Sequence, residues 1–179
     1  EPLKILKKMT DKPLFAFIEA SEIEKGNVPR ARRPTPSEMR AQIWLAVIHG
    51  CRGLFYFPAV VGPGGFQFDG ATPDIVSEMT KQNALLSRVG PLLQGEVNPK
   101  DTAVWAPQLE AGWRRVGKSL LVLLVNPRPS AVRQAKIEIS GTAVKEATDL
   151  VTGRQLPLSG ELKEDLEPFG VRLLLIEES

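Results

Sequence analysis

Residues 13–19 read Pro-Leu-Phe-Ala-Phe-Ile-Glu, and residues 53–58 read Gly-Leu-Phe-Tyr-Phe-Pro. Up to its last residue, each segment is apolar throughout and does not alternate with polar residues. Strands of this kind are typical of parallel sheets covered on both faces. Two such strands are too few to make a parallel sheet that buries itself, so we expect the chain to be the last part of a larger α/β barrel.

A helix is expected between these two strands. Residues 35–38, Thr-Pro-Ser-Glu, supply an N-cap hydroxyl, a proline at the first helical position and the glutamate of a capping box. Gly50 is expected to end this helix, which makes a strand–helix–strand unit. A second helix is predicted to begin at residues 72–74, Thr-Pro-Asp, and to end near residues 90–91.

The character of the chain changes near residue 97, where short β-rich runs separated by turn residues begin. These runs predict an antiparallel sandwich of about seven strands, with Ala111-Gly112 and Thr152-Gly153 among the turns. The fold class is therefore α/β plus all-β: the last quarter of a TIM-type (β/α)8 barrel followed by a β-sandwich. The expected domains are a partial barrel over residues 1–96 and the sandwich over residues 97–179.

Composition limits the possible partners. The 179 residues are 42% hydrophobic and 25% charged, with a net charge of only +2, which is ordinary for a soluble globular protein. Such a small surplus of basic residues does not favour a nucleic-acid partner. No apolar run approaches the roughly 20 residues of a membrane span, so no membrane partner is expected. The compartment is left open, because Cys51 is the only cysteine.

Glu19 is the first candidate catalytic residue. Active sites of α/β barrels are built from side chains at the carboxyl ends of the strands and on the loops that follow. A carboxylate in that position, held rigidly beside apolar walls, suits a nucleophile or a proton donor. The alternative is an ordinary loop glutamate, paired with an arginine of the basic cluster at residues 30–33.

The loop after the second strand is the next candidate. Phe57 ends the strand, Phe66 and Phe68 offer apolar faces to a sugar ring, and Asp69 offers a hydrogen-bond acceptor. These four residues are the predicted substrate-binding residues. The alternative is a surface loop whose phenylalanines lie against the rim of the barrel. Its glycines do not form a phosphate-binding loop, because no Gly-Lys-Ser/Thr follows them.

Other chemistry has little support in the sequence. His49 is the only histidine, so neither a metal site nor a Ser-His-Asp triad is expected, and no cofactor is predicted. Trp105 and Trp113 lie in the β-rich region. They either line a carbohydrate-binding surface or pack within the protein.

Residues 35–50, Thr-Pro-Ser-Glu-Met-Arg-Ala-Gln-Ile-Trp-Leu-Ala-Val-Ile-His-Gly, and residues 53–57, Gly-Leu-Phe-Tyr-Phe, resemble a known helix and strand. They look like the seventh helix and eighth strand of certain barrel glycoside hydrolases, including the β-galactosidase-like enzymes. The Leu-Val-Leu-Leu-Val-Asn of residues 121–126 and the Asp-Leu-Val-Thr-Gly of residues 149–153 are similar to the sandwich that ends many such enzymes.

The resemblance carries an expected role for Glu19. In the larger clan the acid/base follows the fourth strand and the nucleophile follows the seventh. If residues 13–19 are the seventh strand, Glu19 falls on the nucleophile position. The acid/base has no counterpart here, because the first six strands are absent. Hydrolysis requires two carboxyl groups. Asp69 could be the second one, but the sequence does not fix its position, so no catalytic pair of Glu19 and Asp69 is predicted.

The predicted function follows from the resemblance. We expect part of a glycoside hydrolase-like protein that acts on an oligosaccharide or glycoside and is inactive alone. An N-terminal barrel portion, present as a second polypeptide, is the expected protein partner. One alternative is a non-catalytic carbohydrate-binding or structural module. Another is a stand-alone α+β domain that covers the open strand edges with its own β segments.

Overall fold

The computed structural model of the chain describes residues 2–22, 32–62, 65–141, 146–158 and 161–178. The chain forms two compact units, Glu1–Ala84 and Leu85–Ser179. The change from one unit to the other falls within helix α3 (Pro73–Leu93). The domain boundary predicted at residues 96–97 stays a prediction.

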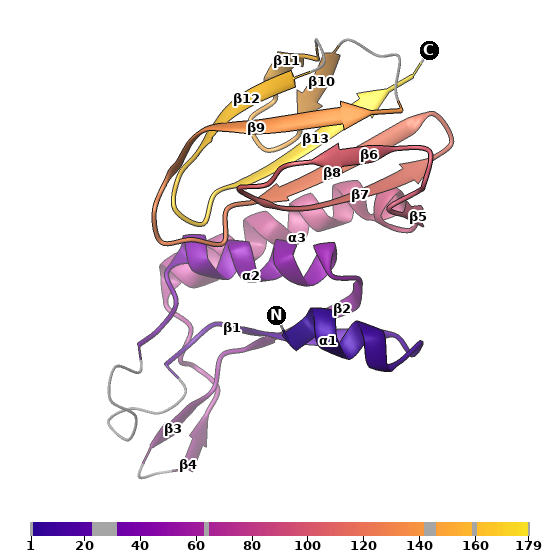
Figure 1. Cartoon of the computed structure of the whole chain (residues 1–179). Helices are drawn as coiled ribbons and strands as arrows, with labels where there is room; N and C mark the ends of the chain where they lie inside the picture. Colours follow the sequence, from indigo (N-terminus) through magenta and orange to yellow (C-terminus); the bar gives the residue numbers. More distant parts are fainter. Residues whose placement is uncertain (1, 23–31, 63–64, 142–145, 159–160, 179) are drawn as a thin grey trace. The chain divides into compact units, whose positions relative to one another are not determined.

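The first unit contains the two apolar strands that were predicted to pair. Strands β1 (Leu14–Glu19) and β2 (Cys51–Phe57) run parallel, with Phe17 opposite Phe55 and Glu19 opposite Phe57. The predicted parallel pairing is therefore confirmed. Helix α1 (Pro2–Met9) precedes β1 (Figure 1). Among the residues that the structure describes, β1 and β2 make up a sheet of two strands.

Helix α2 (Pro36–Ile48) connects β1 to β2 and begins as the sequence predicts. The Thr35 hydroxyl accepts the Glu38 backbone N–H at 3.3 Å, and the Glu38 carboxylate accepts the Thr35 backbone N–H at 2.8 Å. The capping box is thus complete. One face of α2 is buried, and α2 packs against both β1 and β2. That face consists of Met39, Ile43, Trp44, Val47 and Ile48.

A buried polar network joins α2 to α3 within the first unit. The Trp44 indole N–H donates to Gln82 Oε1 at 2.8 Å, and Gln82 Nε2 donates to Glu78 Oε1 at 2.8 Å. Arg40 Nε donates to the same Glu78 oxygen at 2.6 Å. Gln82, which interrupts the apolar stripe of α3 in the sequence, therefore satisfies the one polar atom of a fully buried tryptophan.

Two elements of this region differ from expectation. The predicted loop after β2 contains a short hairpin of β3 (Val60–Gly62) and β4 (Gly65–Gln67). Helix α3 does not end near residues 90–91 but continues through Pro91 to Leu93. Pro91 has no N–H, so it removes one hydrogen bond from the last turn, and only two residues of the helix follow it.

The second unit contains an antiparallel β-sandwich, as predicted. One sheet has the order β11-β10-β13-β8-β7-β5, and the other has the order β12-β9-β6. The strands are β5 (Glu96–Val97), β6 (Ala103–Trp105), β7 (Glu110–Val116), β8 (Ser119–Val125), β9 (Val132–Ser140), β10 (Glu146–Asp149), β11 (Gln155–Pro157), β12 (Glu161–Leu166) and β13 (Val171–Glu177). The sequence predicted about seven strands, whereas the described residues of this unit form nine.

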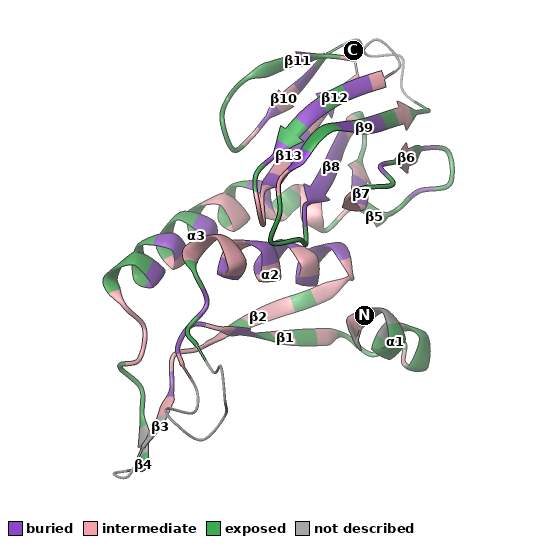
Figure 2. Ribbon diagram, turned by 60° about the vertical axis from the view of Figure 1, so that its left-hand side comes forward, coloured by how far each residue is buried: buried purple, intermediate pink, exposed green. Residues whose placement is uncertain are grey.

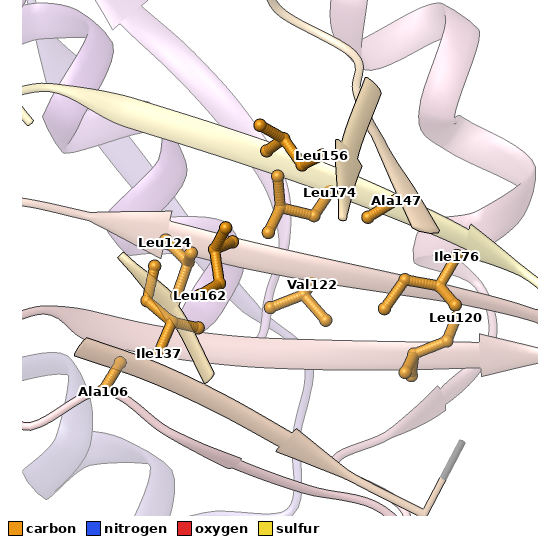
Figure 3. Packing of buried hydrophobic residues seen from close by; sticks show 10 residues of the cluster. All are labelled: Ala106, Leu120, Val122, Leu124, Ile137, Ala147, Leu156, Leu162, Leu174 and Ile176. Carbon is orange, nitrogen blue, oxygen red and sulfur yellow. The ribbon is translucent and has the colours of Figure 1, made fainter. Parts of the chain in front are cut away.

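The sandwich core lies between the two sheets. Alternate side chains of the central strand β8, Leu120, Val122 and Leu124, enter a cluster that Ile137 of β9 and Leu162 of β12 complete from the other sheet (Figure 3). The intervening side chains of β8 are fully buried as well. Strand β8 is paired with β13 on one edge and with β7 on the other.

Two predicted turns have opposite outcomes. Ala111-Gly112 lies inside β7, where Ala111 packs against the core cluster and Gly112 pairs with Leu123. Thr152-Gly153 does form a turn, because Gly153 adopts a φ of +77°. Asp149, which is fully buried, holds this turn by accepting the Val151 N–H at 3.0 Å and the Thr152 hydroxyl at 2.7 Å.

Candidate functional site

Glu19 lies at the carboxyl end of β1, on the face of the sheet that α2 does not cover. Successive side chains of a strand point to opposite faces, so Phe15, Phe17 and Glu19 share one face. Ile18, on the opposite face, is almost fully buried. Phe55 and Phe57 of β2 are paired with Phe17 and Glu19 and therefore lie on the same face as Glu19. The candidate carboxylate thus sits at the end of an aromatic surface.

We call this surface, formed by Phe15, Phe17, Phe55 and Phe57, the aromatic face. The ring centroids of Phe17 and Phe55 are 5.3 Å apart, those of Phe15 and Phe55 are 5.9 Å apart, and those of Phe17 and Phe57 are 6.4 Å apart. Phe15 lies over Gly53, where a Cβ atom would come within 2.4 Å of the ring. The four rings therefore form one continuous apolar layer across both strands.

Hydrogen bonds fix the backbone on both sides of Glu19. Its N–H donates to Oε1 of Gln42 in α2 at 3.3 Å, and the N–H of Ala20 donates to the Phe57 carbonyl at 3.2 Å. The buried Ser21 hydroxyl lies 2.6 Å from the Ala59 carbonyl and 3.2 Å from the Phe57 carbonyl. These contacts hold the end of β1 against the end of β2, so Glu19 begins its loop from a fixed position.

The surroundings of Glu19 raise the pKa of its carboxyl group above the ordinary value. Partial burial raises the pKa of Glu19, the negative charge of Glu38 raises it further, and the positive charge of Arg32 lowers it. The Arg32 guanidinium hydrogen-bonds to Glu38 at 2.5 and 2.7 Å. That hydrogen bond, together with those from Thr35, lowers the pKa of Glu38 to about 2. Arg32, one arginine of the cluster expected to offer Glu19 a partner, is therefore hydrogen-bonded to Glu38, whereas Arg30 lies outside the described residues.

The predicted loop residues occupy different places. Phe68 and Asp69 follow the hairpin and are exposed, Phe68 to 71%. The next residue, Gly70, donates its N–H to the Pro58 carbonyl at 3.0 Å. A Cβ atom at Gly70 would come within 2.8 Å of both that carbonyl and the Ser21 side chain. The backbone beside Asp69 is therefore anchored at the carboxyl end of β2, which the sequence did not fix.

Phe66 is part of β4 and pairs with Val61. Its side chain lies outside the described residues, as do residues 30 and 31 of the basic cluster at residues 30–33. Phe57 belongs to the aromatic face, and its ring and that of Phe17 are in an edge-to-face arrangement. The structure thus brings Phe57 next to Glu19, and the grouping of Phe66, Phe68 and Asp69 around them stays a prediction.

The tryptophans of the sandwich have different environments. Trp113 packs against the core cluster and donates its indole N–H to the Pro99 carbonyl at 3.4 Å. Trp105 lies on β6, at the edge of its sheet, and is 50% exposed. Glu138 of β9 is paired with Trp105, and Glu161 of β12 is paired with Glu138. An aromatic ring and two carboxylates therefore form one row across the outer face of this sheet.

No metal site emerges from the described residues, where no three His, Cys, Asp or Glu side chains come together. Within the same part of the chain, no helix has both the length and the apolar character needed to cross a bilayer.

Comparison with known proteins gives structural similarity only. No protein-family model matches the chain, and no curated protein matches it. An α-amylase from Geobacillus thermoleovorans, solved in complex with acarbose, matches 99% of this chain with a TM-score of 0.65 and 12% identity. An Anoxybacillus α-amylase matches 93% with a TM-score of 0.61 and 12% identity. A GH27 β-L-arabinopyranosidase from Geobacillus stearothermophilus matches 92% with a TM-score of 0.53 and 17% identity.

The chain spans only part of each of these enzymes, namely 42%, 38% and 37% of their lengths. All three are glycoside hydrolases, which agrees with the coarser form of the predicted resemblance. At 12–17% identity the similarity establishes the fold alone. The narrower resemblance to β-galactosidase-like enzymes stays a proposal.

Proposed function

We propose that this chain supplies the last two strand–helix units and the C-terminal sandwich of a (β/α)8-barrel glycoside hydrolase, with Glu19 as a catalytic carboxylate. The observation that carries the proposal is the position of Glu19 at the carboxyl end of a parallel strand, on the face opposite the covering helix. In a barrel, that face is the interior, and that end is where catalytic residues lie. The glycoside hydrolases that share this fold over most of the chain support it.

The chemistry requires a second carboxyl group. In the retaining reaction, one carboxylate attacks the anomeric carbon while a carboxylic acid gives its proton to the leaving oxygen, and water then releases the sugar. Glu19 suits the nucleophile position that the resemblance implies. A raised pKa is typical of the proton-donating acid/base and not of the nucleophile, so the position of Glu19, and not its pKa, supports the nucleophile role. Phe57, Phe66, Phe68 and Asp69 are proposed to contact the sugar, with Phe68 and Asp69 presented at the foot of the β3–β4 hairpin.

The second carboxyl group and most of the substrate cleft would come from the other strands of the barrel. The 179-residue chain alone is therefore proposed to be inactive. The test combines it with the polypeptide encoded in frame ahead of Glu1 and measures release of nitrophenol from a panel of aryl glycosides. We expect hydrolysis only when both polypeptides are present. In that mixture, Glu19→Gln is expected to lower kcat/KM by about 10²- to 10⁴-fold.

Glu22→Gln is the matched control, since Glu22 lies just beyond the end of β1 and is not proposed to contact the substrate. It is expected to leave kcat/KM within about twofold of the wild type. Full activity without the Glu19 carboxylate would rule out the catalytic assignment. Hydrolysis that falls equally in both variants would point to a general charge effect instead.

A second candidate function is carbohydrate binding without hydrolysis. The exposed Trp105 beside the carboxylate of Glu138 favours it, because aromatic rings stack on sugar rings and carboxylates accept hydrogen bonds from hydroxyl groups. Glu161, the next residue of the row, is paired with Lys136 at 2.7 Å. Titration with maltotriose, followed by tryptophan fluorescence, separates the two functions. Binding that is lost in Trp105→Ala and unaffected by Glu19→Gln would favour the binding module.

A further inference from the structure

The aromatic face is an exposed apolar surface with an unusual composition. Phe15 is 57% exposed, Phe17 is 72% exposed and Phe55 is 51% exposed. The other face of the same two strands is covered by α2 (Figure 2). Isolated apolar residues on a surface need no explanation, but contiguous patches mark sites of interaction. The three exposed rings and Phe57 form one contiguous layer, as their centroid distances show.

We propose that the aromatic face and the outer edges of β1 and β2 together form a docking surface for parallel β-strands of another polypeptide segment. One strand would pair with β1 and another with β2, and their apolar side chains would cover Phe15, Phe17 and Phe55. Phe57, beside Glu19 at the carboxyl end, would stay open to the sugar. The inference rests on the proposed function, because it assigns the residues through which the barrel would be completed. It adds the surface, its two edges and the kind of partner that fits them.

The strand edges are the first argument for a polypeptide partner. Within the described residues, β1 and β2 pair only with each other, so each strand has one outer edge of backbone N–H and C=O groups. Such an edge is a template for a further strand. Parallel sheets occur almost only with both faces covered. A partner that adds strands satisfies the edges and covers the face at the same time.

The composition of the surface argues against other occupants. A sugar presents hydroxyl groups along its whole length, and the four rings offer them no hydrogen-bond partner until Glu19 at one end. A second copy of this chain could stack its rings on these, but both pairs of strand edges would remain open. The solved structures with this fold are chains of which this one spans only 37–42%, which leaves room for the additional strands.

The experiment measures docking without catalysis. The polypeptide encoded in frame ahead of Glu1 is expressed separately, and its affinity for the 179-residue chain is measured by calorimetry. Hydrogen exchange then follows the backbone amides of β1 and β2. We expect binding, with slower exchange along both strands. Phe17→Thr and Phe55→Thr are each expected to weaken binding by about tenfold or more, because each removes a ring that would be buried on docking.

Phe68→Thr is the matched control, since Phe68 is as exposed as Phe17 but lies beyond the hairpin and outside the aromatic face. It should leave docking unchanged. Each remaining outcome overturns the proposal: no strand-coding segment ahead of Glu1, no binding, or equal weakening by the control. A dimer of this chain through its phenylalanines, or binding of maltotriose on Phe15, Phe17 and Phe55, would overturn it as well. Docking without hydrolysis would retain this proposal and remove the proposed function. Hydrolysis by the mixture with docking unchanged in Phe17→Thr and Phe55→Thr would retain the proposed function and remove this proposal, and hydrolysis by the 179-residue chain alone would overturn both.

Discussion

Strands β1 and β8 are both apolar over almost their whole length, yet they are buried to very different extents. From Leu120 to Val125, every side chain of β8 is fully buried, and both edges of the strand are paired. In β1, Phe15 and Phe17 are more than half exposed, and only one edge is paired among the described residues. A continuous apolar sequence therefore indicates a strand whose two faces both need to be covered. The second unit covers both faces of β8, whereas the first unit covers only one face of β1.

A cavity-forming substitution in β8 should lower the free energy of unfolding more than any other change proposed here. Leu123→Ala removes a fully buried side chain from a strand that is enclosed on all sides, so the cavity cannot collapse easily. We expect the free energy of unfolding to fall by about 2–5 kcal/mol, measured by urea denaturation. Val116→Ala, on the exposed end of β7, is the control and should change it by about 0.5 kcal/mol or less. Equal losses would mean that the sandwich does not depend on β8.

The next largest loss of stability is expected in the buried network of Trp44, Gln82 and Glu78, in the unit that contains β1 and β2. Gln82→Leu leaves the Trp44 indole N–H buried without its acceptor and removes a donor from Glu78. We expect a loss of about 1–3 kcal/mol in the free energy of unfolding. Gln67→Leu, an exposed glutamine on β4, should be close to neutral. Adding Trp44→Phe to Gln82→Leu removes the unpaired N–H, so the double variant should lose less than the two single losses added together.

The sequence predicted the elements that depend on local signals. The capping box of Thr35 and Glu38 places the start of α2 correctly, because its hydrogen bonds involve neighbours in the chain. Strand β7 was missed, because Ala111-Gly112 is a turn signal locally. Pairing with β8 overrides that signal: Gly112 is tolerated in a strand when its neighbours on both sides pair.

The site was predictable in part for the same reason. Glu19 follows directly from the end of an apolar strand, and the alternation of β1 places it on the face of Phe17. Its neighbours on other elements were not predictable. Gln42 reaches its backbone from α2, and Glu38 and Arg32 shift the pKa of Glu19, through contacts that exist only after α2 packs on the sheet. The polar Gln82 within the apolar stripe of α3 was the signal in the sequence for the buried network that links it to Trp44 and Glu78.

A smaller effect, of opposite sign, is expected at Glu19 itself. The folded chain raises the pKa of Glu19, so the folded state disfavours the ionised carboxylate. The contribution of Glu19 to stability should therefore decrease as the pH rises from the unfolded pKa, near 4.5, through the folded pKa, and stay constant above it. Glu19→Gln removes this penalty and should raise the Tm at pH 7.5 by more than at pH 3.5. Glu22→Gln is the control. If Glu19→Gln raised the Tm by more at pH 3.5 than at pH 7.5, that result would contradict the raised pKa of Glu19.

The smallest effect should come from the exposed face of β1, where the comparison with β8 is sharpest. Phe17→Thr removes a ring that is 72% exposed and replaces it with a residue that also favours strands. In the isolated chain we expect the free energy of unfolding to change by about 0.5 kcal/mol or less, in contrast to Leu123→Ala. Urea denaturation of the two variants side by side measures this difference. A loss as large as that of Leu123→Ala would mean that the ring is already buried in solution, and that β1 has found the same covering as β8 without a partner.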